Sequence, residues 1–302
     1  MLAAVSRPCH PAGMGKKRGI LLVVLFVALA GGVVWMLSRP AEPLYQGKPL
    51  SAWLKEYNGV LGDTNQAAFV VFREMGTDAI PALLKIMQSD DPPLFQRMMS
   101  ELDRRQSLVY FPVRGSWQQR WAASSALYVM GANAKPAFPV LTNLLFRTNT
   151  FWLSAVPLAG MGSDGLAPLI AALTNQNSFI RFSAAIALRW ERSDLNIVVL
   201  ALIDRLSDQD NLVHQTAVTA LGELHAEPGL AVPALMKDYP VNDRWLLRSP
   251  ILIALGRFET NASAAVPMLL ESLTDSHQEV RIDAASALKQ IDPAAAAKAG
   301  VK

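Results

Sequence analysis

The chain has 302 residues, of which 51% are apolar and 18% are charged, and it contains one cysteine. This composition excludes an intrinsically disordered protein and a small scaffold held together by disulfides. The formal net charge is +3, but residues 1–39 hold five basic residues and no acidic one, so the remainder carries two more acidic than basic residues. A body that is basic overall is therefore excluded, and we expect no nucleic acid partner.

Residues 19–38 form a run without a charged side chain. At about 1.5 Å per helical residue, such a run is long enough to cross the hydrocarbon core of a bilayer. The basic residues 16–18 precede it, whereas only Arg39 follows it closely. This asymmetry predicts a cytoplasmic tail over 1–18, a single-pass anchor in the inner membrane over 19–38, and a periplasmic body.

A cleaved signal sequence is the alternative interpretation of the same segment. Ala28 and Ala30, just before Gly31, have the small side chains of a cleavage site. The body is exported under both interpretations. Cys9 precedes the apolar run and has no partner for a disulfide, and either Met1 or Met14 is a sensible start of the protein.

A pattern recurs through the body of the chain at intervals of 30 to 34 residues. Its centre is an Ala-Leu pair, and six residues before the Ala stands a basic residue. Six residues further back stands an Asn or Asp, the type of side chain that caps a helix N-terminus. The basic residues are Arg120, Arg181, His214, Arg248 and Arg281, and the capping candidates are Asn175, Asp208, Asn242 and Asp275.

Each unit predicts two helices. In the first, small and apolar residues share one face, as with Val280, Ala284 and Leu288. It is expected to end near a glycine, and the second helix is expected to begin at a proline. The glycines are Gly76, Gly131, Gly162, Gly222 and Gly256, and the prolines are Pro139, Pro168, Pro233 and Pro267. Because two helices cannot bury their apolar faces alone, about seven units must stack over 64–302.

The register from Asp275 to Leu288, together with that from Ala262 to Leu269, resembles HEAT repeats of the short bacterial kind, including those of bilin-lyase-like proteins. The segments 45–54 and 292–302 further resemble a family of membrane-tethered bacterial HEAT-repeat proteins without an assigned activity. The resemblance implies an all-α, right-handed α-solenoid that acts as a scaffold for a protein or peptide partner.

Two segments depart from the repeat. Residues 39–63 form a linker with a short amphipathic helix over 51–57, which either caps the open end of the array or lies on the membrane. An insertion at about 88–118 either binds a partner or covers the first repeat pair. In addition, Pro157 and Pro250 fall inside first helices and are expected to kink them.

Two sets of residues are candidates for a site. The recurrent basic residues either pair with Asp208, Asp275 and their equivalents or form a ladder for an anionic ligand. Aromatic and arginine residues are typical of binding surfaces, although large aromatic residues also fill the seams between repeats, as Phe151, Phe182 and Trp190 are placed to do. The candidate partner-binding residues are Tyr110, Phe111, Arg114, Trp121 and Trp152.

No catalytic or metal-binding motif is found in the sequence, so we expect no cofactor and no enzymatic activity. No histidine is followed directly by Glu; His225 and His277 each precede a Glu by two residues, which places the side chains on different faces of a helix. The expected function is a membrane-anchored, exported scaffold. The alternative is a lyase or a metal-dependent modifying enzyme built on the same repeats.

Overall fold

The computed structural model describes residues 26–27, 30–31, 43–57, 67–89, 116–147, 150–239 and 245–301. The chain divides into two units, Met1–Pro43 and Leu44–Lys302. The expected tail over 1–18 and most of the expected anchor over 19–38 lie outside the described residues, and the four described residues of the anchor are helical. Among the described residues, no helix is both long and apolar enough to cross a membrane.

A short hairpin opens the second unit. Strand β1 (Leu44–Tyr45) pairs antiparallel with β2 (Lys48–Pro49), and Gln46 and Gly47 form the turn with φ of 49° and 76°. The expectation of an all-α fold did not include these strands. They are too short to show the alternating pattern of side chains by which strands are usually predicted.

The amphipathic helix expected over 51–57 is α2 (Leu50–Glu56). Leu50, Trp53, Leu54 and Tyr57 are buried, and α2 contacts two helices of the array, α3 (Ala67–Glu74) and α6 (Ser116–Met130). The indole Nε1 of Trp53 donates to the carbonyl oxygen of Tyr45 at 2.9 Å, so the helix is tied to the hairpin as well. The apolar face of α2 therefore covers the start of the array.

Seven helix pairs follow in the described part of the chain. The first helices are α3 (Ala67–Glu74), α6 (Ser116–Met130), α8 (Phe151–Gly160), α10 (Ser178–Leu188), α12 (Asn211–Leu224), α14 (Trp245–Gly256) and α16 (Gln278–Ile291). The second helices are α4 (Ile80–Met87), α7 (Phe138–Leu145), α9 (Ser163–Ala172), α11 (Leu195–Asp204), α13 (Pro228–Asp238), α15 (Val266–Ser272) and α17 (Pro293–Lys298). Single-turn or longer 3₁₀ segments join some of them: η1 (Thr77–Ala79), η2 (Gly131–Ala137), η3 (Arg205–Ser207) and η5 (Glu259–Ala265).

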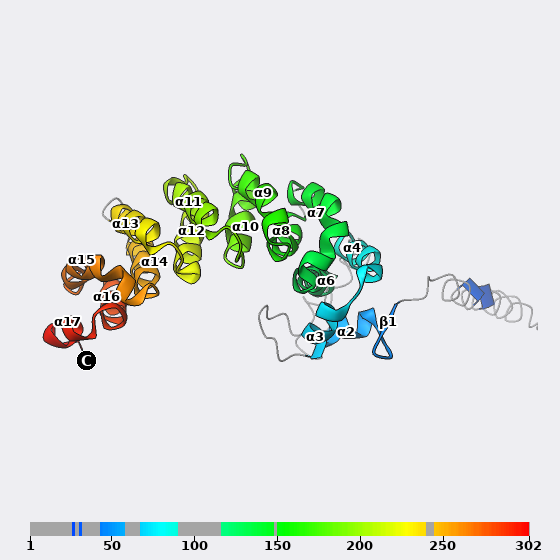
Figure 1. The fold of residues 1–302 in the computed structure, drawn as a ribbon, viewed down its shortest axis with the longest axis horizontal. Coiled ribbons are helices and arrows are strands. Elements are labelled where there is room, and N and C mark those ends of the chain that lie inside the picture. Colours follow the sequence, from blue (N-terminus) through cyan, green and yellow to red (C-terminus); the bar gives the residue numbers. More distant parts are fainter. Residues whose placement is uncertain are drawn as a thin grey trace, which may run out of the picture. The chain divides into compact units, whose positions relative to one another are not determined.

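The pairs stack in chain order within the second unit. From α6 to α16, each first helix packs on the next first helix. Figure 1 shows the first helices from α6 to α16 in one row and the second helices from α7 to α15 in another. One buried cluster of apolar residues continues from Leu50 to Ala296, so the helix pairs share a single core. The structure is thus almost entirely helical and has the repeating architecture of an α-solenoid.

The glycines have two different roles. Gly131 and Gly162 follow first helices in the left-handed region, with φ of +56° and +62°, and turn the chain as expected. Gly222 does not, because it lies inside α12 and lets α14 approach: a Cβ at Gly222 would lie 2.7 Å from the Cα of Ala254. The chain turns instead at His225, whose φ is 36°.

The prolines also divide into two groups. Pro139 and Pro267 stand in the first turns of α7 and α15, as predicted. Pro168 and Pro233, by contrast, lie inside α9 and α13, because both helices begin about one turn earlier than expected. Residues 90–115 of the expected insertion lie outside the described residues, and its last residues, 116–118, belong to α6.

Candidate functional site

A turn of constant geometry precedes α10, α12 and α16. In each turn a side-chain oxygen accepts the backbone N–H of the residue two positions later. The accepting residues are Asn175 at 2.9 Å, Asp208 at 3.0 Å and Asp275 at 2.8 Å. These side chains hold the turns. The pattern in the sequence predicts that they cap the helices, and this prediction is wrong.

The caps lie two residues further along the chain. Asn177 accepts the backbone N–H of Phe179 at 3.0 Å, and Asp210 accepts that of Leu212 at 2.9 Å. His277, at the same place before α16, makes no side-chain cap. The signal was present in the sequence, since Asn or Asp occurs at both positions in Asn-Gln-Asn and Asp-Gln-Asp.

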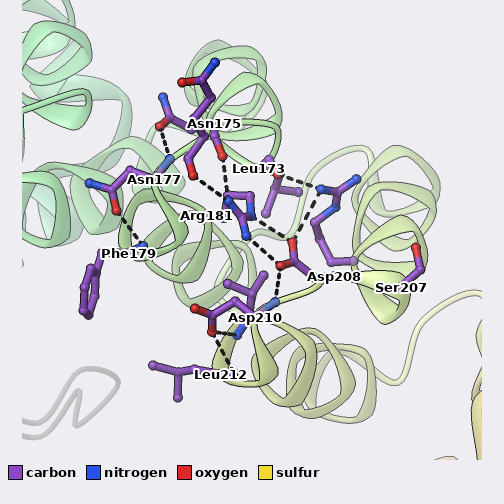
Figure 2. A network of polar contacts seen from close by, with 12 residues as sticks. Leu173, Asn175, Asn177, Phe179, Arg181, Ser207, Asp208, Asp210 and Leu212 are labelled. Atoms are coloured by element: carbon purple, nitrogen blue, oxygen red, sulfur yellow. Dashed lines mark hydrogen bonds and ion pairs between the residues drawn. The ribbon is translucent and has the colours of Figure 1, made fainter.

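Arg181 joins two successive turns (Figure 2). Its Nε and Nη2 donate to the two carboxylate oxygens of Asp208 at 2.8 and 2.7 Å, and its Nη1 donates to the carbonyl oxygen of Asn175 at 2.8 Å. The side chain of Asp208 is only 3% exposed and that of Arg181 is 14% exposed. A two-point ion pair of this kind is stronger than a hydrogen bond between neutral groups and fixes the relative orientation of its partners.

The same contacts recur near the C-terminal end. Arg248 on α14 donates to a carboxylate oxygen of Asp275 at 2.6 Å. Arg281 on α16 donates to the carbonyl oxygens of Asp275 and Ser276 at 2.7 and 3.1 Å, as Arg181 does at its own turn. The recurrent arginines therefore bind the protein's own turns, and each pair links one unit to the next.

The remaining two positions differ. Nε2 of His214 lies 2.8 Å from a carboxylate oxygen of Asp238, at the end of α13, and both side chains are nearly buried. This contact stays inside one helix pair, since His214 is on α12 and Asp238 is on α13. Asn242, the predicted partner position, lies outside the described residues. Arg120 is half-buried on α6 at the equivalent place.

Hydrogen bonds and nearby positive charges lower the pKa of two carboxyl groups. Burial acts to raise the pKa of Asp208, but the hydrogen bonds from Arg181 and from the N–H of Asp210, with the charges of Arg181 and Arg205, bring it below the ordinary value of 3.8. For Asp275, burial is likewise outweighed by the backbone and side chain of His277 and by the charge of Arg248. Both groups are therefore carboxylates at neutral pH.

These pKa shifts predict loss of stability in acid. A carboxyl group with a lower pKa in the folded state stabilises the fold above its unfolded pKa, and this contribution disappears as the pH falls through the folded value. The free energy of unfolding should therefore be flat near neutral pH and fall below about pH 4, because the ordinary pKa is 3.8. Urea unfolding measured from pH 7 to pH 3 tests this. The double variant Asp208→Asn/Asp275→Asn should show a shallower fall, and an identical pH profile would contradict the assignment.

A second row of ion pairs was missed by the sequence analysis. Arg189 and Arg257 both pair with Glu223, so the row joins the residue after α10, a residue of α12 and the residue after α14. Arg189 Nη2 donates to Glu223 at 2.6 Å and Arg257 lies 3.4 Å from it. All three residues follow an Ala-Leu pair by one or two positions, and that offset was the available signal.

A polar hollow of about 290 Å³ lies beside the Arg181 network. Its ionisable residues are Arg181 and Arg205, opposed by Asp204 and Asp208. Arg205 donates to the carbonyl oxygen of Leu173 at 3.0 Å and lies 3.6 Å from Asp208. Because the charges balance and the arginines are engaged, this hollow does not form a cationic site for an anionic ligand.

The surface of the first helices is hollowed at a different place. An apolar groove of about 350 Å³ crosses α6, α8 and α10. We call it the aromatic groove and define it by its lining residues, which are Trp121, Phe151, Trp152, Val156, Phe179, Phe182, Ser183 and Ile186. None of these side chains is ionisable, and five of them are aromatic.

The aromatic rings stack across the helix boundaries. The rings of Trp121 and Trp152 lie 5.9 Å apart with an angle of 19° between their planes, and those of Phe151 and Phe179 lie 6.3 Å apart. Such offset arrangements are favourable beyond the area that they bury. Phe179 nonetheless remains 59% exposed. The groove is thus held in shape by its own rings while it leaves apolar surface open.

The predicted site residues fall partly in this groove. Trp121 and Trp152, from two different units, come together there with Phe151 and Phe182. Tyr110, Phe111 and Arg114 lie outside the described residues. Trp190 does not join the groove; its ring contacts Tyr128 edge-on at 6.3 Å.

Two further lining residues were not predicted. Phe179 and Ile186 stand on either side of Phe182 at i−3 and i+4, so a helical projection of α10 would have placed all three on one face. Among the described residues, there is no group of three or more His, Cys, Asp or Glu side chains that could hold a metal ion.

One protein family matches part of the sequence. Residues 265–294 match the family model of the HEAT repeat. The match runs from the end of η5 through α15 and α16 into the start of α17. The match and the stacked pairs support a HEAT-repeat protein.

Comparison with curated proteins gives no match. Two crystal structures of engineered proteins are similar to this chain. One is 21% identical, with a TM-score of 0.44, and the match covers 71% of this chain and 96% of that one. The other is 19% identical, with a TM-score of 0.40, and the match covers 83% of this chain and 71% of that one.

Proposed function

We propose that this protein is a membrane-anchored, exported HEAT-repeat scaffold that binds a protein or peptide partner through the aromatic groove. HEAT repeats generally mediate interactions between proteins, which is consistent with such a partner. The observation that carries the binding role is the open apolar surface of the groove, where Phe179 is 59% exposed. Exposed aromatic residues in a preformed hollow are typical of the residues that dominate binding energy.

The groove differs from the charged surface of the array in the residues that form it and in the number of helices that contribute them. The recurrent arginines elsewhere are engaged by carboxylates and by backbone carbonyl groups. The groove, in contrast, gathers side chains from three successive first helices, and its shape depends on the stacking of the units. A partner that bound there would contact three repeats at once.

The binding role is tested by a pair of matched substitutions. Phe179→Asp places a charge in the groove, and Ile282→Asp places one on α16, outside it; the two side chains are 59% and 56% exposed. Complexes are stabilised by formaldehyde in cells and the full-length protein is purified. We expect the partner to be lost from the Phe179→Asp sample and retained with Ile282→Asp. A partner retained equally by both variants would contradict the proposal.

The proposed location rests on the uncharged run over 19–38 and on the basic residues before it. Reporter fusions at the C-terminus test it. A reporter that is active only in the periplasm should be active, and a fluorescent protein that matures only in the cytoplasm should stay dark. The reverse pattern would place the array in the cytoplasm and overturn this part of the proposal.

A further inference from the structure

The charge of the aromatic groove limits what can enter it. All eight lining residues are uncharged, and the polar part is confined to Ser183 and the two indole N–H groups. A charged side chain inserted there would lose its hydration without meeting an opposite charge, which is strongly unfavourable. The part of a partner that enters the groove is therefore uncharged and apolar.

Ser183 supplies a second and independent constraint. Its side chain is 3% exposed, it lines the groove, and its Oγ has no hydrogen-bond partner among the described residues. Ser154, on the neighbouring helix α8, shows the usual solution, since its hydroxyl donates to the carbonyl oxygen of Phe151 at 3.0 Å. A buried hydroxyl without a partner is destabilising. An occupant with a hydrogen-bond acceptor would remove this cost.

The two constraints together select one class of occupant. The hydrocarbon part of a lipid chain is apolar but carries no acceptor for the hydroxyl of Ser183. A peptide segment with apolar side chains is equally uncharged and carries a carbonyl oxygen at every residue. Packed helices lie 8–10 Å apart, so crossing three of them takes roughly 16–20 Å, which an extended chain covers with about five or six residues.

We infer that the aromatic groove binds an extended, uncharged and apolar peptide segment of about six residues, with one of its main-chain carbonyl groups accepting a hydrogen bond from Ser183. This inference rests on the proposed function and adds the chemistry of the partner. The rings of Trp121, Trp152 and Phe179 contact the apolar side chains of the peptide, and the hydroxyl of Ser183 donates a hydrogen bond to its main chain.

The test uses the full-length protein in phosphatidylcholine nanodiscs and a fluorescently labelled hexapeptide of Leu, Ala and Phe with blocked ends. Binding is followed by fluorescence anisotropy. We expect binding that is at least about tenfold weaker when the Phe of the peptide is replaced by Glu. The Ser183→Ala variant should bind about fivefold more weakly, the effect of one lost hydrogen bond. The Ser154→Ala variant should bind normally, because the hydroxyl of Ser154 in the parent protein is already bonded to the carbonyl oxygen of Phe151.

Several results would overturn the inference. Equal binding of the peptide with Glu would remove the requirement for an uncharged segment, and unchanged binding by Ser183→Ala would remove the contact with the backbone. Displacement of the peptide by dodecane, a hydrocarbon without an acceptor, from both the parent protein and Ser183→Ala would assign the groove to lipid chains. A dimer that Phe179→Asp dissociates would assign it to a second copy. Binding that requires deletion of residues 108–113 would assign it to the chain's own segment.

The inference and the proposed function fail in different ways. If Phe179→Asp removes the partner in cells while no peptide binds in nanodiscs, the scaffold role stands and the class of partner is wrong. If the peptide binds as described while Phe179→Asp leaves the partner in cells unaffected, the site recognises peptides but is not the surface used by that partner.

Discussion

Replacing Gly165 with alanine is expected to destabilise the array more than any other single methyl group added to a glycine of the described chain. Gly165 lies in the first turn of α9, against the C-terminal half of α8. A Cβ at this position would lie 1.8 Å from the carbonyl oxygen of Leu158, and the atom it meets belongs to the backbone and cannot rotate away. The free energy of unfolding should fall by about 3 kcal/mol or more, at the upper end of the range for overpacking.

Gly229→Ala is the matched control. Gly229 is exposed in the first turn of α13, and no atom lies within 4 Å of the position of its Cβ. There, alanine should raise stability by roughly 0.5 kcal/mol, because it reduces the freedom of the unfolded chain. Urea unfolding of the full-length variants, followed by circular dichroism, measures both changes. Equal stabilities for Gly165→Ala and the parent protein would show that α8 and α9 do not approach as described.

The second large effect is expected from Asp208→Ala. This substitution leaves Arg181 nearly buried without its carboxylate and also removes the acceptor that holds the turn before α12. Removal of one partner of a buried pair typically costs about 3–5 kcal/mol, because the charge left behind is not compensated. We expect about 3 kcal/mol here, since Arg181 keeps its bonds to the carbonyl groups of Asn175 and Gln176.

One further variant separates the charge from the turn, and a second is a control on an exposed ion pair. Asp208→Asn keeps an acceptor for the N–H of Asp210 and should recover part of the loss. Lys135→Ala breaks the exposed pair with Asp164 and should change stability by less than about 1 kcal/mol. The midpoint of urea unfolding reports all three variants. If Asp208→Ala were as mild as Lys135→Ala, the Arg181 network would not link the units.

The architecture was predictable because the repeat constrains many positions at once. A two-helix unit, found seven times in the described residues, leaves little freedom in which helices pack together, and a single core follows. The role of the recurrent Asn and Asp residues was less determined. Asn175 and Asp208 were placed at caps, but Asn and Asp also hold turns, and Asp208 is bound by Arg181 of the preceding helix pair.

Features that depend on contacts between units were the hardest to predict. Gly222 looks like a helix end in the sequence, and only the approach of Ala254 explains why a side chain is excluded there. The aromatic groove is similar. Trp152 follows Trp121 by 31 residues and Phe179 follows Trp152 by 27, and they become neighbours only because α6, α8 and α10 stack. Half of this site was foreseen from the aromatic residues, and the buried hydroxyl of Ser183 was not.

The most direct measurement of the central claim is site-specific photocrosslinking from within the groove. A photoreactive phenylalanine analogue replaces Phe179 in one full-length variant and the equally exposed Ile282 in another, and both are irradiated in intact cells. The adducts are mapped by mass spectrometry. Our account predicts that the variant at position 179 alone attaches to an uncharged, apolar stretch of another protein. Adducts of equal yield from both positions, or adducts to charged segments, would contradict it.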